Sequence, residues 1–98
     1  MATEQQIQSK LIKKLEAKGY YVIKLSLTNK PGIPDILALP KDCSAIFIEV
    51  KRPGKKPNAL QMYRIKEIKK YGIKSCWYNG EEYFDLNQEQ EEGDQDVV

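Results

Sequence analysis

The chain has 98 residues, of which 41% are hydrophobic and 31% are charged, and its formal net charge is +2. This length suits one small soluble domain, with a core of one sheet and about two helices. The chain contains no histidine, which nearly excludes an ordinary zinc site and removes nucleophilic catalysis by a Ser/His or Cys/His pair. Any hydrolysis by this chain would depend on carboxylates, lysine and a metal ion.

The opening residues 1–6 lack the apolar core of a signal peptide, and no apolar run approaches membrane-spanning length. We therefore expect a cytoplasmic protein with no membrane partner. Cys43 and Cys76 lie far apart in the sequence and belong to no C-x-x-C pair. Two reduced thiols are the expected state of such cysteines in a reducing compartment.

The first predicted element is a helix that begins after Thr3, because Thr3 and Gln6 have the spacing of a capping box. Gly19 is expected to end this helix in a left-handed conformation. One side of the helix is apolar and the other is basic, through Ile7, Leu11, Ile12 and Leu15 on the first side and Lys10, Lys13, Lys14 and Lys18 on the second. Residues 20–27 then predict a strand with Tyr21, Ile23, Leu25 and Leu27 on one face.

The middle of the chain predicts two neighbouring strands. The second strand begins at Pro34 and runs to residue 39, and the third covers residues 45–51. The turn-forming segment 40–44 is expected to join them as a hairpin. A basic loop rich in proline and glycine follows at residues 52–57.

The remaining elements are a second helix and one or two strands. Asn58 is expected to cap a helix over residues 59–71, which Gly72 ends. A strand at residues 73–78 follows, and Asn79-Gly80 is typical of a type I′ turn that leads into a short strand near residues 83–86.

The resulting order, α-β-β-β-α-β with one further short strand, predicts an α/β fold in which two helices flank a mixed sheet. We expect a single domain over residues 1–86. Residues 87–98 are acidic, polar and free of aromatic side chains, so they are expected to form a disordered tail.

Charge is distributed unevenly along the chain. Residues 1–80 contain all 16 Lys and Arg and six acids, an excess of ten positive charges, whereas residues 81–98 contain eight acids and no base. The basic part predicts a surface for nucleic acid, although lysine-rich faces are often only solvated. The acidic tail could compete with DNA for that surface or serve only as a solubilising end, and the sequence leaves both readings open.

Charged residues occupy unusual positions in the two central strands. Side chains alternate along a strand, so Glu49 and Lys51 share a face with Phe47, and Asp35 shares a face with Leu37. If the strands are neighbours, two carboxylates and one ammonium group converge at one end of the sheet. Carboxylate oxygens suit Mg²⁺ or Mn²⁺, which would activate water for phosphodiester hydrolysis. Lys51 would orient or deprotonate that water; the alternative is an exposed ion pair of little consequence.

Two further polar residues continue apolar helix stripes. Glu4 lies three and seven residues before Ile7 and Leu11, and Gln61 lies four residues before Ile65. Both are in a first helical turn and are expected to face the sheet. Together with the charged strand residues, they predict a polar pocket.

These residues, taken in order, resemble a known family. The segments Gly32-Ile33-Pro34-Asp35 and Ile48-Glu49-Val50-Lys51, the basic Gly-Lys loop and Gln61 resemble the VRR-NUC domain of the PD-(D/E)xK nuclease superfamily, over roughly residues 4 to 78. The resemblance implies a restriction-endonuclease-like core. It also implies site roles: Asp35, Glu49 and the backbone carbonyl of Val50 as metal ligands, Lys51 as the catalytic lysine, Glu4 reaching the metal through water, and Gln61 supporting the site.

Stand-alone members of this family resemble Holliday-junction resolvases and act as dimers. We therefore expect a homodimeric Mg²⁺- or Mn²⁺-dependent endonuclease that cuts branched DNA such as junctions or flaps. Arg52, Lys55 and Lys56 are expected to contact the DNA backbone beside the cut. A nuclease of this size suits a phage or mobile element and would then act in the cytoplasm of a bacterial host.

Two other classes remain open at this point. One is a catalytically silent nucleic-acid-binding module with a nuclease fold. The other is a small interaction protein whose acidic tail is the working part.

Overall fold

The computed structural model of the chain describes residues 2–42 and 44–85. Its helices and strands are, in chain order, α1 (Glu4–Ala17), β1 (Tyr21–Lys24), β2 (Ile36–Leu39), β3 (Ile46–Val50), α2 (Ala59–Lys69), β4 (Lys74–Tyr78) and β5 (Tyr83–Asp85). The predicted order of elements is confirmed, and the short last strand is present. Cys43 and the acidic segment 87–98 lie outside the described residues.

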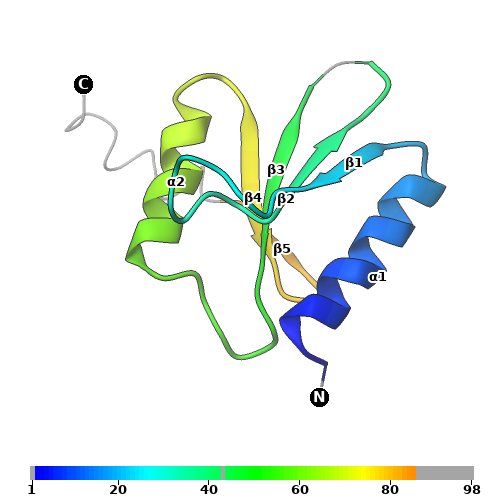
Figure 1. Ribbon diagram of the computed structural model, residues 1–98, viewed down its shortest axis with the longest axis horizontal. Coiled ribbons are helices and arrows are strands. Elements are labelled where there is room, and N and C mark those ends of the chain that lie inside the picture. Colours follow the sequence, from blue (N-terminus) through cyan, green and yellow to red (C-terminus); the bar gives the residue numbers. More distant parts are fainter. Residues whose placement is uncertain (1, 43, 86–98) are drawn as a thin grey trace.

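The five strands form one sheet in the order β1-β2-β3-β4-β5. β3 and β4 are parallel and are connected through α2, whereas the other neighbouring pairs are antiparallel. The predicted mixed sheet and the β2–β3 hairpin are therefore confirmed. Figure 1 shows α1 and α2 on opposite sides of this sheet.

The main core lies between α1 and one face of the sheet. The capping box of Thr3 and Gln6 begins α1 as predicted, and Gly19 follows the helix with φ +95°. The buried side chains of this core are Ile7, Leu11 and Leu15 from α1 and Ile36, Ala38, Ile48, Val50 and Tyr78 from the sheet. Their burial removes apolar surface from water and fixes α1 on the sheet.

A smaller core lies on the opposite face, under α2. Ile65 is fully buried there against Trp77, which stacks on Phe84 with ring centroids 4.2 Å apart. Tyr21 and Ile23 also belong to this face, because they alternate with Val22, which packs into the α1 core. They are 68% and 37% exposed, so the β1 end of this face is open to solvent.

Three predicted boundaries differ from the structure by two residues or more. β1 ends at Lys24 rather than continuing to residue 27, and Leu27 is 94% exposed. Here the Thr28 hydroxyl bonds the backbone of Lys30 and turns the chain. β2 begins at Ile36, with Pro34 buried just before it. α2 ends at Lys69, two residues earlier than predicted.

The prediction of a two-residue type I′ turn at Asn79-Gly80 is wrong. Tyr78 pairs with Tyr83, so four residues connect β4 to β5. The Asn79 side-chain oxygen accepts hydrogen bonds from the backbone N–H groups of Glu81 and Glu82, at 2.9 and 2.8 Å. An Asx-type turn thus competes with the tighter hairpin and replaces it.

Neither helix combines the length and apolar character that crossing a bilayer requires, among the residues described.

Candidate active site

The predicted convergence of charged residues at one end of the sheet is present. Asp35 immediately precedes β2, and Glu49 is the penultimate residue of β3, with Lys51 just beyond the end of that strand. Ile36 pairs with Ile48 in the antiparallel register, which brings Asp35 beside the end of β3. The backbone N–H of Val50 donates to Asp35 Oδ2 at 2.8 Å. The two strands therefore hold the two carboxylates close together.

The segment before Asp35 is fixed from both sides. The N–H of Leu25 donates to the Asp35 carbonyl at 2.8 Å, and Arg64 Nε of α2 donates to the Pro31 carbonyl at 2.9 Å. Gly32 has φ +80°, and a Cβ there would lie 2.7 Å from Leu60 Cγ. Only glycine fits this contact without displacing Leu60 of α2. Figure 1 shows this loop reaching across to α2.

Glu49 is a buried carboxylate, 2% exposed, with Lys51 Nζ 3.6 Å from its Oε2. Burial, assisted by the charge of nearby Asp35, raises the pKa of Glu49 to about 8, and Lys51 opposes this shift only in part. Burial likewise raises the pKa of Asp35, while the Val50 N–H and Lys51 lower it. Ionising these two buried carboxyl groups is therefore costly in free energy when only protein groups surround them. A bound cation would lower that cost.

One oxygen of Glu49 is buried and accepts no hydrogen bond. Within residues 2–42 and 44–85, three buried side-chain oxygens make no hydrogen bond, those of Gln8, Ser75 and Glu49 Oε1. Only the oxygen of Glu49 belongs to an acid. A buried carboxylate oxygen that lacks a donor, beside a second carboxylate, has the character of a ligand for Mg²⁺ or Mn²⁺.

Glu4 lies close to this pair but not in it. Its Oε2 accepts a hydrogen bond of 3.4 Å from the backbone N–H of Arg52, and its charge raises the pKa of both Asp35 and Glu49. Among the described residues, no three acidic, cysteine or histidine side chains are grouped closely enough to bind one metal ion directly. The predicted contact of Glu4 with a metal ion through water stays a prediction.

Comparison with known proteins finds similar folds among solved structures. No protein-family model matches the chain, and no curated protein matches it. A solved structure named "VRR_NUC domain" superposes with a TM-score of 0.72 and 25% sequence identity, covering 99% of this chain and 100% of that one. The chain has the VRR-NUC fold. A second solved structure, named "VRR_NUC domain protein", matches with a TM-score of 0.68 and 16% identity, covering 99% of this chain and 89% of that one.

The resemblance that the sequence motifs predicted is therefore confirmed, and so is the α/β nuclease-like fold class. The two motifs that carried it, around Asp35 and around Glu49, are the ones that this VRR-NUC fold brings together at the junction of β2 and β3.

Gln61 has a local role that the sequence analysis did not assign. Its Oε1 accepts a 2.9 Å hydrogen bond from the backbone N–H of Asn58, and the Asn58 side chain accepts from the Gln61 N–H in return. This capping box begins α2. This oxygen is occupied by the helix cap, and support of the candidate site by Gln61 stays a prediction.

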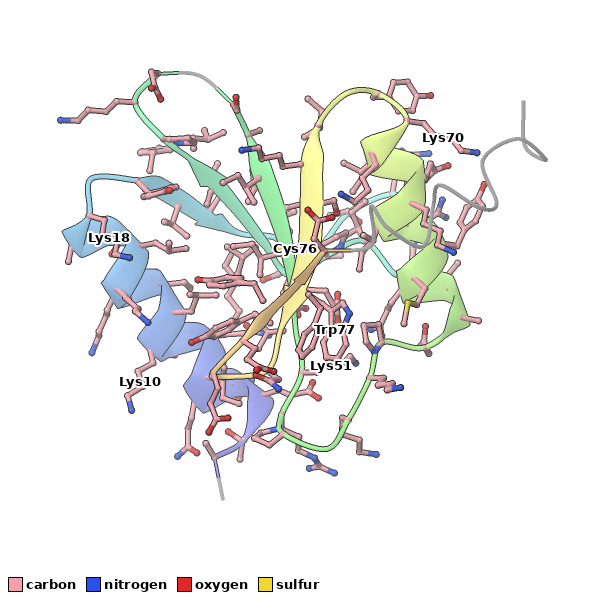
Figure 2. The ribbon with its side chains drawn as sticks, turned by 180° about the vertical axis from the view of Figure 1, so that it is seen from behind. Lys10, Lys18, Lys51, Lys70, Cys76 and Trp77 are labelled. Atoms are coloured by element: carbon pink, nitrogen blue, oxygen red, sulfur yellow. The ribbon has the colours of Figure 1, made fainter. Side chains whose placement is uncertain are left out.

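Two lysines near the carboxylates differ in placement. Lys51 is only 15% exposed at its side chain, and Figure 2 shows it near the middle of the molecule. Lys24, at the end of β1, lowers the pKa of Asp35 through its charge. The sequence analysis gave Lys24 no role. Lys24 pairs with Ile36, the residue after Asp35, so a predicted pairing of the first two strands would have indicated that this lysine lies near Asp35.

The three residues predicted to contact DNA are at the surface, and the thiol of Cys76 is unreactive. Arg52, Lys55 and Lys56 are all exposed in the loop after β3. Cys76 is a free, half-buried thiol, and burial raises its pKa to about 11. A thiol with so high a pKa is a poor nucleophile at neutral pH.

Proposed function

We propose that this chain is a Mg²⁺- or Mn²⁺-dependent endonuclease that hydrolyses phosphodiester bonds in branched DNA. The observation that carries the proposal is the buried Glu49 carboxylate, with one oxygen lacking a donor, beside Asp35 and Lys51 in a VRR-NUC fold. A module that only binds nucleic acid gains nothing from clustered carboxylates, which repel phosphate.

Each residue has a distinct part in this proposal. Asp35 and Glu49 would hold the cation, with the Val50 carbonyl as a further ligand and Glu4 acting through water. The bound cation would supply Lewis-acid stabilisation of the phosphate and a water of lowered pKa. Lys51 Nζ lies 3.6 Å from Glu49 Oε2. As an ammonium group it would orient that water and offset part of the negative charge that develops on the phosphate, whereas as a neutral amine it would take the proton of the water.

The direct test is a cleavage screen of single-stranded, duplex, flap and four-way DNA with Mg²⁺, Mn²⁺ or EDTA. The proposal expects cuts that require metal and that are fastest on branched substrates. Metal-independent turnover would contradict it. Tight DNA binding without cleavage under all metal conditions would instead support a catalytically silent binding module.

The exposed basic loop gives a prediction about binding. Replacing Arg52, Lys55 and Lys56 with glutamine should weaken DNA binding to a similar degree on all sequences, because these side chains would contact phosphates rather than bases. The slope of log affinity against log salt should fall by roughly 0.9 per lost contact on duplex DNA. Fluorescence anisotropy over a salt series measures this slope. Base-sequence-dependent losses would contradict the prediction.

A homodimer is the second part of the proposal, and the exposed β1 face gives it a test. Tyr21 and Ile23 form an apolar patch on an edge strand, and a twofold axis could bury the same patch from two copies.

Sedimentation at micromolar concentration should show a dimer. The change of Tyr21 and Ile23 to lysine should weaken it by roughly 30-fold or more, as for a central interface contact. The Tyr71→Lys variant is the matched control, since Tyr71 is 82% exposed beyond α2. A wild-type monomer that still cuts junctions would rule the dimer out.

A further inference from the structure

Lys24, the last residue of β1, lies at the end of the sheet that carries the candidate active site. It pairs with Ile36, the residue that follows Asp35, and the backbone N–H of Leu25 donates to the Asp35 carbonyl at 2.8 Å. The pairing of β1 with β2 therefore continues up to Asp35 itself. It holds the backbone of Lys24 one strand spacing, about 4.8 Å, from the start of β2.

The strand order places Lys24 and Lys51 on opposite sides of the carboxylates. β1 and β3 are the two neighbours of β2, so Asp35 lies between a lysine that ends β1 and a lysine that follows β3. Glu49 lies on the β3 side of Asp35. A line across the strand ends thus passes Lys24, the two carboxylates and then Lys51.

The ammonium groups of these two lysines have different surroundings. Lys51 is largely buried and pairs with Glu49. Lys24 is exposed, and within residues 2–42 and 44–85 its ammonium group makes no hydrogen bond or ion pair. Its charge nevertheless acts on Asp35, whose pKa it lowers. The N–H donors of Lys24 are therefore free for a ligand that approaches the carboxylates.

Charged groups from both faces of the sheet reach this end of it. The Lys24 side chain starts on the α1 face, because its partner Ile36 belongs to the α1 core. At a strand end, the long stem of a lysine can pass around the backbone and hold its charge in solvent. Glu4 also comes from the α1 side, and its charge acts on both Asp35 and Glu49. A start on the α1 face is thus compatible with action at the carboxylates.

We propose that Lys24 binds the DNA backbone phosphate next to the one over the carboxylates, and so sets the path of the cleaved strand across the ends of β1, β2 and β3. The inference deepens the proposed endonuclease function and rests on it. The phosphate over Asp35 and Glu49 needs a bound cation to offset repulsion. A phosphate one strand further, toward β1, meets a free ammonium group. A lysine contacts phosphate as a point charge and does not read bases there.

The first test measures binding in EDTA, where the proposed nuclease cannot cut. Lys24→Gln should weaken binding of a labelled four-way junction by roughly 10-fold, as for loss of one hydrogen bond to a charged group. The slope of log affinity against log salt should fall by roughly 0.9, the value for one duplex phosphate contact. Lys24→Arg keeps the charge and should retain both the affinity and the slope of wild type.

The matched control for this test is Lys41→Gln. Lys41 is also an exposed lysine, but it follows Leu39, at the opposite end of β2 from Asp35. Its removal changes the net charge of the protein by the same amount. Affinity should stay within about twofold of wild type, as for surface substitutions generally, and the salt slope should not change.

The second test locates the contact on the DNA. A methylphosphonate, which replaces one charged phosphate oxygen with a methyl group, is placed in turn at the two phosphates that flank the cut. At one of them it should lower kcat/KM of the wild type by roughly 10-fold. In Lys24→Gln the same methylphosphonate should change kcat/KM by less than about twofold, because the contact is already lost. At the other flanking phosphate, the two losses should add.

A third measurement separates a phosphate contact from an effect on the carboxylates. If Lys24 acted only by favouring the charged form of Asp35, its removal would weaken metal binding and leave DNA binding in EDTA as in wild type. A phosphate-binding lysine has no such effect, since its charge repels a metal ion. Mg²⁺ or Mn²⁺ should therefore stabilise Lys24→Gln against thermal unfolding at least as much as wild type.

The two proposals fail in distinguishable ways. Equal effects of Lys24→Gln and Lys41→Gln on affinity and salt slope would leave Lys24 as an edge-strand lysine that only discourages pairing with other sheets, and would overturn the inference. Additive losses at both flanking phosphates would also overturn it. Either result, with metal-dependent cleavage intact, leaves the nuclease standing. A loss of binding specific to Lys24→Gln, in a chain that cuts no DNA with any metal, would support the phosphate contact and remove the nuclease.

Discussion

Replacing Asp35 with asparagine or Glu49 with glutamine should abolish metal-dependent DNA cleavage, with a loss of at least roughly 10³-fold in kcat/KM. Both changes keep the shape of the side chain and remove the charge that would bind the cation. The fold should survive the Asp35→Asn change, because the new amide keeps one oxygen that can accept from the Val50 N–H, as the carboxylate does. Cleavage of a labelled four-way junction, with circular dichroism as the check on folding, measures the result.

The controls for these variants are acids of the same type outside the site. Glu16→Gln and Asp42→Asn change exposed residues of α1 and of the β2–β3 loop, so cleavage should stay within about twofold of wild type, as for surface substitutions generally. Lys51→Ala should lose roughly 10²–10⁴-fold in rate, the usual contribution of a general acid or base, while metal binding persists. Wild-type turnover in excess EDTA would refute the metal-dependent scheme.

The local parts of the fold could be predicted because their causes are local. Thr3 and Gln6 specify the beginning of α1 through two hydrogen bonds between residues three apart, and the spacing alone reveals them. The alternation along residues 45–51 correctly predicted that Glu49 lies on the face of the strand opposite Ile48 and Val50, because the side-chain period of a strand is fixed. Proximity of Asp35 followed from one assumption, the hairpin between two consecutive strands, which the register confirms.

The parts that sequence reasoning missed depend on partners far along the chain. Gly32 is required by its contact with Leu60, and the loop is tied by Arg64 to Pro31, 33 residues apart. The expected I′ turn does not form because the Asn79 side chain accepts a hydrogen bond from the Glu81 N–H. The Asn-Gly dipeptide alone does not predict this hydrogen bond. The Gln61 side chain caps its own helix, a contact that the sequence analysis did not assign although the spacing from Asn58 allows it.

Burial is also non-local, and it changes the meaning of Glu49. In the sequence, an exposed ion pair was the alternative reading of Glu49 and Lys51. In the structure Glu49 is 2% exposed with one oxygen lacking a donor, so the exposed-pair alternative is wrong.

The buried Glu49 carboxyl should make the stability of the metal-free protein depend on pH. Its pKa is about 8 in the fold against an ordinary value of 4.5, so between these pH values the folded protein keeps a proton that the unfolded chain releases. The free energy of unfolding in EDTA should therefore fall as pH rises from about 4.5 to about 8, by a few kcal/mol at most. The raised pKa of Asp35 acts in the same direction. Urea unfolding at a series of pH values measures the trend.

The Glu49→Gln variant should then have opposite effects on stability and on metal binding. Without a titrating carboxyl at this position, it should be more stable than wild type in EDTA at about pH 8.5, and the difference should shrink toward about pH 5. Mg²⁺ or Mn²⁺ should stabilise the wild type, by about 2.7 kcal/mol at 100 times Kd, and more readily at higher pH because the cation displaces a proton. The variant should gain almost nothing from metal. The Glu16→Gln change should leave both the pH trend and the metal effect as in wild type. A Glu49→Gln protein that is less stable than wild type in EDTA at this alkaline pH, or that metal stabilises as much as wild type, would show that Glu49 is a structural acid and not a metal ligand.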